Sequence, residues 1–375
     1  MSNASIVNNG GIIFAGSDIG FGTGKTDILL EDKALKFYIQ ATIATGGDRR
    51  LAKMQEKFDP QKSDLTNQLL CMDVEIQDHQ TSVTRHVFMG KVAITDGTDS
   101  RYCWGDNKSS DEDSMALLIT QLAAGQTERA GGKDSDAVFY VGTGLPIKHY
   151  FELKEAYENN IKGDYTVTFK SGPWQGVKSN LKIIRCKVYP QVYGIFYDET
   201  HDESGASINL AYQQGYTLVL DPGFRTTDYA VFIDGMMKDA YSGSSELGIA
   251  FALKQISEKL LEKGIHLDEK ELDFNFMEND GIYKYKGNEI DLKPLLDAAL
   301  KNLAKKLYDD LKLKLQPVWD KLHITLIGGG GGIGLYKHLS FKNMKLVSNP
   351  QFGNASGFRK AAQAIVRKSL QENGR

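Results

Sequence analysis

The stretch Asp18-Ile-Gly-Phe-Gly-Thr-Gly-Lys25 lies between two apolar runs near the start of the chain. These runs, residues 12–16 and 26–30, have the length and the aliphatic content of β-strands. The pattern therefore predicts a hairpin in which an aspartate ends the first strand and glycines form the turn. Glycine turns expose main-chain N–H groups that suit phosphate oxygens, and a neighbouring carboxylate suits Mg²⁺ held through water.

The second half of the chain repeats this arrangement. Asp221-Pro-Gly-Phe-Arg-Thr-Thr-Asp228 follows the apolar run 216–220 and leads into the run 228–233. A single Asp-x-Gly turn indicates no more than a hairpin. Two of them, one in each half of the chain and each between strands, indicate a duplicated phosphate-binding unit.

A third glycine-rich segment follows a late strand. Residues 324–327 are predicted to form a strand, and Gly328-Gly-Gly-Gly-Gly332 comes next, ahead of a helix predicted at residues 335–339. A main chain without side chains can lie flat against a base or ribose, with N–H groups facing a phosphate; the alternative is a flexible loop. The chain contains 38 glycines but only 8 prolines, so the glycine excess belongs to local turns and not to Pro/Gly linkers.

Two better-known glycine motifs do not fit the first hairpin. The stretch Gly22-Thr-Gly-Lys-Thr26 resembles the end of a P-loop, but the first glycine of that motif would fall on Ile19. The P-loop and the dinucleotide-binding G-x-G-x-x-G both lead into a helix, whereas residues 26–30 are predicted to form a strand.

The composition is typical of a soluble protein of two domains. A chain of 375 residues is longer than one small hydrophobic core requires. A composition of 41% hydrophobic and 25% charged residues excludes disorder of the whole chain. A net charge of −3 provides no strong basic field for nucleic acid. Cys71, Cys103 and Cys186 are too far apart for a disulfide framework or a paired-cysteine metal site, and the histidines show no metal-ligand spacing. No membrane-spanning run and no signal peptide are evident, so we expect a cytoplasmic protein.

The two hairpins and the late glycine segment together resemble the ATPase superfamily of actin, heat-shock chaperones and sugar kinases, over most of the chain. The resemblance implies an α/β, actin-like (ribonuclease H-like) fold: two related lobes, each a mixed sheet flanked by helices, with a nucleotide cleft between them. We expect the first domain at residues 11–190 plus 352–375, the second at 191–351, and a disordered tail at 1–10. The stretch Val188-Tyr-Pro-Gln191 resembles the connection between the lobes.

Within this superfamily, several segments resemble the ParM-type actin-like proteins of bacteria and archaea. They are Phe88-x-Gly90-x-x-Ala93, Thr143-Gly-Leu-Pro146, residues 241–248 and residues 349–358. The resemblance implies an actin-like ATPase that polymerises into filaments in an ATP-dependent manner and drives plasmid DNA segregation. It also implies ATP or ADP and Mg²⁺ as ligands, self-association into a homopolymer, and a DNA-binding adaptor protein as partner, with no membrane attachment.

The resemblance further assigns roles to single residues. Gln191 and Asp221 are the predicted catalytic residues, with Gln191 orienting the attacking water, and Asp18 and Asp221 are predicted to hold Mg²⁺. The predicted nucleotide-binding residues are Asp18, Gly20, Phe21, Gly22, Thr23, Gly24, Lys25, Gly223, Phe224, Arg225, Thr226, Asp228, Gly328, Gly329 and Gly330. The chain departs from the family at Phe224 and Arg225, where small residues are usual, and at Gln191, where some ParM proteins have Glu.

Other functions remain open on the same fold. Because no strong base is in view, the predicted hydrolysis is slow and suits a timer of assembly better than a metabolic catalyst. A small-molecule kinase would need a catalytic aspartate and a substrate pocket that no segment supplies, and a chaperone would need a following substrate-binding domain. A non-segregating cytoskeletal scaffold would differ only in its partners. We expect polymer contacts at residues 49–67 and 95–108.

Overall fold

The chain divides into two compact units, Met1–Ile208 with Phe352–Arg375, and Asn209–Gln351. The computed structural model describes residues 11–30, 33–49, 69–103 and 110–373 of this chain. The predicted disordered tail lies outside the described residues. So do residues 50–67 of the first predicted polymer-contact segment and residues 104–108 of the second.

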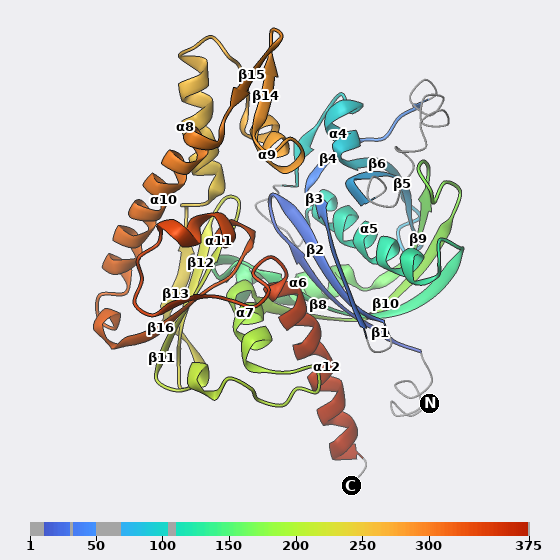
Figure 1. Ribbon diagram of the computed structural model, residues 1–375. Helices are drawn as coiled ribbons and strands as arrows, with labels where there is room; N and C mark the ends of the chain where they lie inside the picture. Colours follow the sequence, from blue (N-terminus) through green and yellow to red (C-terminus); the bar gives the residue numbers. More distant parts are fainter. Residues whose placement is uncertain (1–10, 31–32, 50–68, 104–109, 374–375) are drawn as a thin grey trace. The chain divides into compact units, whose positions relative to one another are not determined.

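The first unit is built on one large mixed sheet (Figure 1). Among the described residues, ten strands lie in the order β3-β2-β1-β8-β10-β9-β5-β6-β4-β7. β1 pairs antiparallel with β2 and parallel with β8, and β8 pairs parallel with β10. The carboxyl ends of β1, β8 and β10 therefore meet at one edge of the sheet. The strands are β1 (Ile13–Ile19), β2 (Thr23–Leu30), β3 (Lys33–Gln40), β4 (Thr42–Thr45), β5 (Cys71–Asp78), β6 (Thr84–Gly90), β7 (Arg101–Tyr102), β8 (Ser135–Leu145), β9 (Gly163–Phe169) and β10 (Lys178–Pro190).

Helices cover both faces of this sheet. Because successive side chains of a strand point to opposite faces, Ala15 and Val141 belong to the main core with α5 and α6. On the opposite face, Phe14 and Tyr140 pack against Ala362 of α12. The helices of this unit are α4 (Lys91–Thr95), α5 (Glu112–Arg129), α6 (Ile147–Ile161), α7 (Gln191–Thr200) and α12 (Gly353–Asn373).

Asp111 caps helix α5. Asp111 accepts hydrogen bonds from the backbone N–H groups of Asp113 and Ser114, which satisfies two donors of the first turn. The helix is buried throughout residues 116–127, polar side chains included. The apolar spacing of the sequence predicts a helix here, but it does not predict that every face of the helix is covered.

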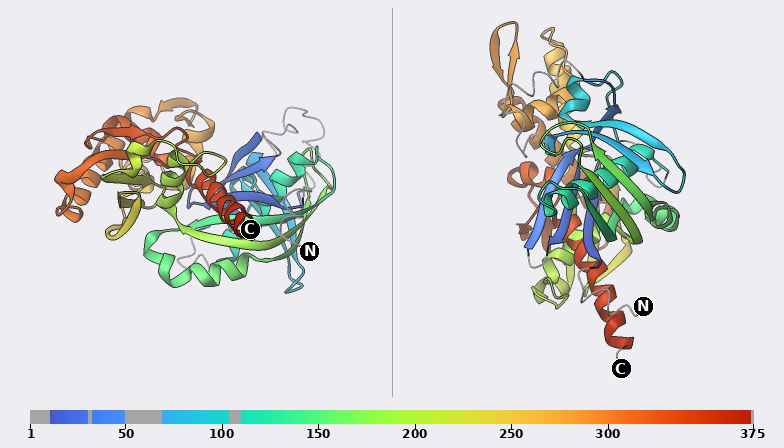
Figure 2. Two further views of the ribbon diagram at one scale, coloured as in Figure 1. Left: turned by 90° about the horizontal axis from the view of Figure 1, so that it is seen from below. Right: turned by 90° about the vertical axis from the view of Figure 1, so that its right-hand side faces the viewer.

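Helix α12 is fastened to the sheet by a fully buried arginine. Arg359 donates from Nε to Oδ1 of Asp27 on β2 at 2.8 Å, and its terminal nitrogens donate to both carboxylate oxygens of Glu203 at 2.7 Å. Burial opposes the charge of Arg359, yet the hydrogen bonds to Glu203 and the charge of Asp27 raise its pKa. The C-terminal helix is therefore an integral part of the first unit, and β1 begins on the side of the unit where α12 ends (Figure 2).

The second unit repeats the sheet pattern in a smaller form. Five strands lie in the order β13-β12-β11-β16-β17, and β11 pairs antiparallel with β12 and parallel with β16. These are the relations of β1 to β2 and β8 in the first unit, so the segment β3-β2-β1-β8-β10 recurs in order and direction. The repeat confirms the predicted fold class of two related mixed-sheet lobes. The strands are β11 (Tyr216–Pro222), β12 (Thr227–Ile233), β13 (Met236–Ser245), β16 (Leu322–Ile327) and β17 (Met344–Leu346).

Helices α8 and α10 pack against the sheet of the second unit. Leu253 and Ile256 of α8 pack with Leu303 and Leu307 of α10 against β11 and β12. A small hairpin and a capped helix, which the sequence reasoning missed, lie between them in the chain. The remaining elements are α8 (Ile249–Leu261), α9 (Glu269–Glu278), β14 (Ile282–Tyr285), β15 (Asn288–Asp291), α10 (Lys293–Lys314), α11 (Gly330–Leu335) and the short 3₁₀ helices η2 (Leu210–Gln213), η3 (Trp319–Lys321) and η4 (Tyr336–His338).

Two expectations about positions in the chain differ from the structure. The helix predicted at residues 335–339 is α11, which begins earlier, at Gly330. Glycines start this helix because it approaches β11 so closely that a Cβ at Gly331 would lie 2.6 Å from the carbonyl oxygen of Pro222. The units divide after Ile208, whereas the expected domain boundary follows Pro190, since α7 packs against α12 through Gly194. No helix in the described part of the chain has the length and hydropathy needed to cross a membrane.

Candidate functional site

The first candidate site is the hairpin between β1 and β2. Asp18 at the end of β1 lies directly opposite Lys25 on β2. The N–H of Gly20 donates to the carbonyl of Thr23 at 3.1 Å and closes the turn. A Cβ at Gly20 would lie 2.9 Å from that same carbonyl oxygen, so the turn as built requires glycine. The turn leads into a strand and not into a helix, which agrees with the exclusion of a P-loop.

Three predicted residues of this hairpin region come together around one carboxylate. Asp18 is buried, with 4% of its surface exposed. Its Oδ2 accepts from Nζ of Lys25 at 3.4 Å, and its Oδ1 accepts from Nε2 of Gln191, the first residue of α7, at 3.0 Å. An aspartate that accepts hydrogen bonds from an ammonium and an amide is fixed in orientation.

The tip of this hairpin contacts helix α5 and the residue that follows β3. The carbonyl of Gly22 accepts from the N–H of Ala41 at 2.9 Å, just after β3. Gly24 lies against α5, where a Cβ would come 2.6 Å from Nε2 of Gln121. Packing within the first unit, as well as the geometry of the turn, therefore favours glycine at the tip.

The second unit contains a matching hairpin between β11 and β12. The N–H of Gly223 donates to the carbonyl of Thr226 at 2.8 Å, and a Cβ at Gly223 would lie 3.0 Å from that oxygen. Asp221 lies directly opposite Asp228. The hydrogen bond, the close approach and the register position of the aspartate all repeat those of the first hairpin.

The charge of the second hairpin differs from that of the first. Asp221 and Asp228 are both buried, 8% and 3% exposed, and carboxylates directly opposite each other on neighbouring strands repel. Asp228 also accepts a hydrogen bond from Oγ of Ser244 on β13. A pair of neighbouring carboxylates supplies hard oxygen donors, which fit a divalent cation such as Mg²⁺.

The fit to Mg²⁺ is that of a cation bound together with phosphate. Within the described ranges, no group of three or more His, Cys, Asp or Glu side chains is arranged to enclose a metal ion. Mg²⁺ commonly takes only one or two carboxylates from a protein and completes its shell with water and substrate phosphates. Asp221 in the second hairpin and Asp18 in the first each offer one buried carboxylate for such a cation.

Helix α8 braces the turn of the second hairpin. The N–H groups of Ile249 and Ala250, in the first turn of α8, donate to the carbonyls of Gly223 at 3.1 Å and Phe224 at 2.7 Å. A Cβ at Gly248 would lie 2.4 Å from the carbonyl carbon of Arg225. The main chain of the turn is therefore fixed, while the side chain of Arg225 is exposed at its tip.

The late glycine segment runs directly beside Asp221. Gly329 has a positive φ of 72°, and a Cβ there would lie 2.2 Å from Oδ1 of Asp221. The N–H of Gly328 donates to the carbonyl of Leu220 at 2.8 Å, which joins the segment to β11. The structure thus brings Gly328, Gly329 and Asp221 together within the second unit, and contact of these glycines with adenosine remains a prediction.

Sequence reasoning missed the polar residues behind the first hairpin. Ser17 donates from Oγ to Oε1 of Gln121 at 2.9 Å, and Thr143 donates from Oγ1 to the carbonyl of Ser17 at 2.7 Å. All three residues are fully buried. In the sequence, Gln121 stands between the apolar residues 116–119 and 122–124. This position indicates a special role only once the helix is known to be buried on every face.

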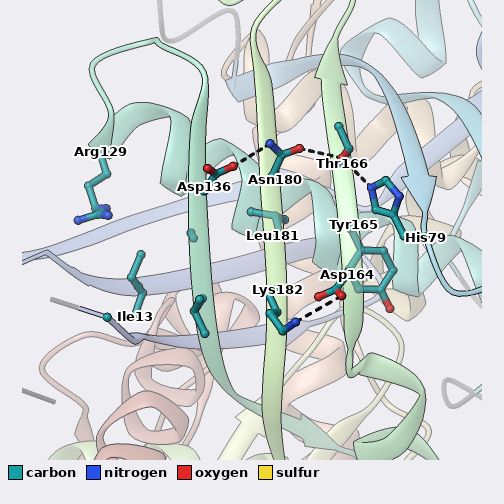
Figure 3. Close-up of a pocket in the computed structure, with 13 residues that line it drawn as sticks. Ile13, His79, Arg129, Asp136, Asp164, Tyr165, Thr166, Asn180, Leu181 and Lys182 are labelled. Atoms are coloured by element: carbon teal, nitrogen blue, oxygen red, sulfur yellow. Dashed lines mark hydrogen bonds and ion pairs between the residues drawn. The ribbon is translucent and has the colours of Figure 1, made fainter. Parts of the chain in front are cut away.

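A separate pocket of about 560 Å³ lies elsewhere in the first unit (Figure 3). A row of hydrogen bonds crosses it, from His79 to Thr166, from Thr166 to Asn180 and from Asn180 to Asp136, each 2.8 Å long. None of the predicted site residues lines it. The pocket lies at the amino ends of β8 and β10, whereas ligands of open α/β sheets bind at the carboxyl ends.

Two family models of actin-like proteins match this chain, one in each half. Residues 16–194 match the family model of the N-terminal domain of actin-like proteins, and residues 219–341 match that of the C-terminal domain of archaeal MreB-like actin homologues. No curated protein matches the chain in sequence.

Several solved structures have the same fold. A subunit of a 15-stranded ParM filament from Clostridium botulinum has a TM-score of 0.74 at 22% identity, covering 94% of this chain and 99% of that one. Bacillus thuringiensis ParM with ATP has a TM-score of 0.69 at 17% identity, with 96% and 99% covered. An archaeal actin homologue has a TM-score of 0.69 at 20% identity, with 94% and 99% covered. Since both halves match actin-like models in the expected order, and each carries the same aspartate–glycine hairpin on the same strand pattern, this chain belongs to the actin-like protein superfamily.

Proposed function

We propose that this protein is a ParM-like ATPase, which polymerises into filaments in an ATP-dependent manner and drives plasmid DNA segregation. The observation that carries the proposal is the pair of matching hairpins, each closed by a glycine and each bearing a buried aspartate. Actin-like proteins use such hairpins to bind the phosphates of ATP. Burying an aspartate lowers stability, so two such hairpins are best explained by a function in binding.

In this proposal each residue of the hairpins has a chemical task. Lys25 contacts a β- or γ-phosphate oxygen, and Asp18 and Asp221 hold Mg²⁺ through water. The cation, when bound with nucleotide, neutralises phosphate charge. The remaining predicted residues of the turns and of the late glycine segment, Arg225 among them, contact the nucleotide.

Gln191 is the proposed positioning group for the attacking water. Its Nε2 donates to Asp18, which fixes the amide and leaves Oε1 able to accept a hydrogen bond from water. An amide orients water without removing its proton, so the hydrolysis we propose is slow. Slow hydrolysis suits a protein whose nucleotide state reports the age of a filament.

The similar structures support self-association. One is a subunit of a ParM filament, and others are ParM proteins with ATP, a non-hydrolysable ATP analogue or ADP. We extend these properties to this chain and propose a homopolymer in the cytoplasm, which a DNA-binding adaptor protein connects to plasmid DNA.

Assembly assays test the proposal directly. Purified protein is mixed with Mg²⁺ and ATP, a non-hydrolysable analogue or ADP, and light scattering, pelleting and phosphate release are followed together. We expect polymer with ATP and the analogue, less polymer with ADP, and phosphate release that follows assembly. Phosphorylation of a small molecule without assembly would make the protein a kinase, and equal assembly in every nucleotide state would make it a scaffold.

A further inference from the structure

The most unusual buried group of the first unit is the side chain of Gln121. It lies in the middle of α5, with none of its surface exposed, among leucines and alanines. Its Oε1 accepts from Oγ of Ser17, but its Nε2 has no hydrogen-bond partner among the residues that the structure describes. A buried amide donor without a partner costs stability that a methionine or leucine at the same place would not.

Gln121 reaches the first hairpin on the face opposite to Asp18. Ser17 and Asp18 are neighbours on β1, so their side chains point to opposite faces of the sheet. Gly24, opposite Ile19 on β2, has no side chain, and the space that its Cβ would take is where Nε2 of Gln121 lies, 2.6 Å away. The amide therefore fills the inner side of the hairpin whose outer side carries the ion pair of Asp18 and Lys25.

Ser17 is held from two sides as a result. Gln121 engages its hydroxyl and Thr143 of β8 engages its carbonyl oxygen at 2.7 Å. The same carbonyl belongs to the peptide unit that carries the N–H of Asp18. The position of Asp18 along β1, and hence its distances to Lys25 and Gln191, depends on this peptide unit.

We propose that Gln121 is a positioning residue for phosphate chemistry at the first hairpin. It anchors Ser17, and through Ser17 it fixes the peptide and the carboxylate of Asp18. The inference rests on the proposed ATPase function, because it assigns to Gln121 an effect on turnover. A displacement of about 1 Å at a reacting centre lowers a rate by up to about a hundredfold.

The chain offers a matched control on the same helix. Gln126 is also buried, 2% exposed, and its Nε2 donates to the carbonyl of Asp136 at 3.3 Å, at the other end of β8 from the hairpin. Gln121→Met and Gln126→Met each remove one buried amide and keep the length of the side chain. A general loss of packing in α5 would affect the two variants alike.

Three measurements distinguish positioning from stability. For Gln121→Met we expect kcat to fall about tenfold or more while the affinity for Mg²⁺–ADP changes less than about twofold. We also expect faster amide hydrogen exchange in the peptides that span residues 14–30 of the nucleotide-free protein. For Gln126→Met we expect no change in kcat or in the exchange of these peptides, whatever the change in its melting temperature.

The outcomes separate this inference from the proposed function. Equal kcat and equal exchange in Gln121→Met and wild type would overturn the positioning role, and so would equal effects of the two variants. A wild-type protein without nucleotide hydrolysis would remove the proposed function, while exchange in the hairpin peptides would still decide whether Gln121 holds them. If Gln121→Met fails to fold, Ser17→Ala removes the same hydrogen bond with a smaller change in volume, and its kcat and exchange decide in the same way.

Discussion

Lys25 and Asp228 occupy the same register position in two matching hairpins and carry opposite charges. Each lies directly opposite an aspartate at the end of the preceding strand. In the first hairpin the Nζ of Lys25 is 3.4 Å from Asp18, so the pair is close to neutral. In the second hairpin two buried carboxylates face each other across the strands. The two hairpins therefore have different electrostatic requirements, and substitutions in them have different expected results.

Replacing Lys25 by Met removes the cation of the first hairpin. Of the two side chains that hold Asp18 in the described part of the chain, the amide of Gln191 then remains. We expect the affinity for Mg²⁺–ATP to fall about tenfold or more, because a partly buried charge contributes more than an exposed one. Isothermal titration calorimetry measures this change. Lys182→Met is the control, since its ion pair with Asp164 is exposed, and an equal affinity in Lys25→Met and this control would contradict the assigned role.

Neutralising Asp221 separates cation binding from stability. Asp221→Asn removes the repulsion with Asp228, so the free energy of unfolding without nucleotide should stay equal or rise by up to about 1 kcal/mol. Hydrolysis should be abolished, and the extra stabilisation that Mg²⁺ gives in the presence of ATP should disappear from thermal melts. Asp234→Asn, in the turn after β12, serves as control. Phosphate release at the wild-type rate from Asp221→Asn would remove Asp221 from the site.

Two alanine substitutions five residues apart, at Gly329 and Gly334, test the close approach at Asp221. In Gly329→Ala the new Cβ would lie 2.2 Å from Oδ1 of Asp221, at a φ of 72°. We expect a loss of about 1–3 kcal/mol in stability together with loss of nucleotide binding. In Gly334→Ala, within α11, the Cβ would meet only Leu300 at 3.5 Å, and stability should be kept or gained. Chemical denaturation and fluorescent-nucleotide binding compare the two.

Replacing Arg359 by Met tests the buried attachment of α12. Asp27 would keep a hydrogen bond from Ser356 and its ion pair with Lys36 at 3.7 Å, but lose its buried guanidinium partner. We expect a loss of about 3 kcal/mol, the lower end of the usual cost of breaking a buried pair, because Lys36 still offsets part of the charge of Asp27. Adding Asp27→Asn should recover part of it, and urea unfolding measures both variants. If the double variant lost more stability than the two single variants together, Arg359 and Asp27 would not compensate each other's charge.

His201 makes stability depend on pH. Its ring stacks on Tyr197 at 3.9 Å, and burial lowers its pKa, with the charge of Lys360 acting in the same direction. The unfolded chain then binds a proton more readily than the folded one, so stability falls as the pH drops below the ordinary histidine pKa of about 6.5. His201→Phe keeps the stacking and should lose less stability than wild type between about pH 7.5 and about pH 5.5. Melting temperatures with equal slopes over this range would contradict the assignment.

The hairpins were predictable from sequence because their signals are local. Aspartate, glycine and flanking apolar runs specify strand, turn and strand within a few residues. Their recurrence in the second half of the chain predicts the two related units, which the repeated strand order confirms.

The remaining features depend on tertiary contacts and therefore escape such patterns. Gln121 has the sequence context of any glutamine in an amphipathic helix, and only the burial of every face of α5 makes it significant. The early start of α11 depends on how closely Gly331 approaches Pro222. The packing of α7 against α12 joins residues that are far apart in the chain, so the sequence places a boundary at Pro190 where the structure continues the first unit.

The position of α12 in the chain has a consequence for biosynthesis. A ribosome delivers residues 209–351 before it delivers the helix that covers Phe14 and Tyr140 and neutralises Asp27. The second unit has all its strands and helices at that moment, whereas the sheet of the first unit still lacks one layer. Vectorial synthesis thus orders maturation: the inserted unit can fold first, and the strand that bears Asp18 receives its final support only near the end of translation.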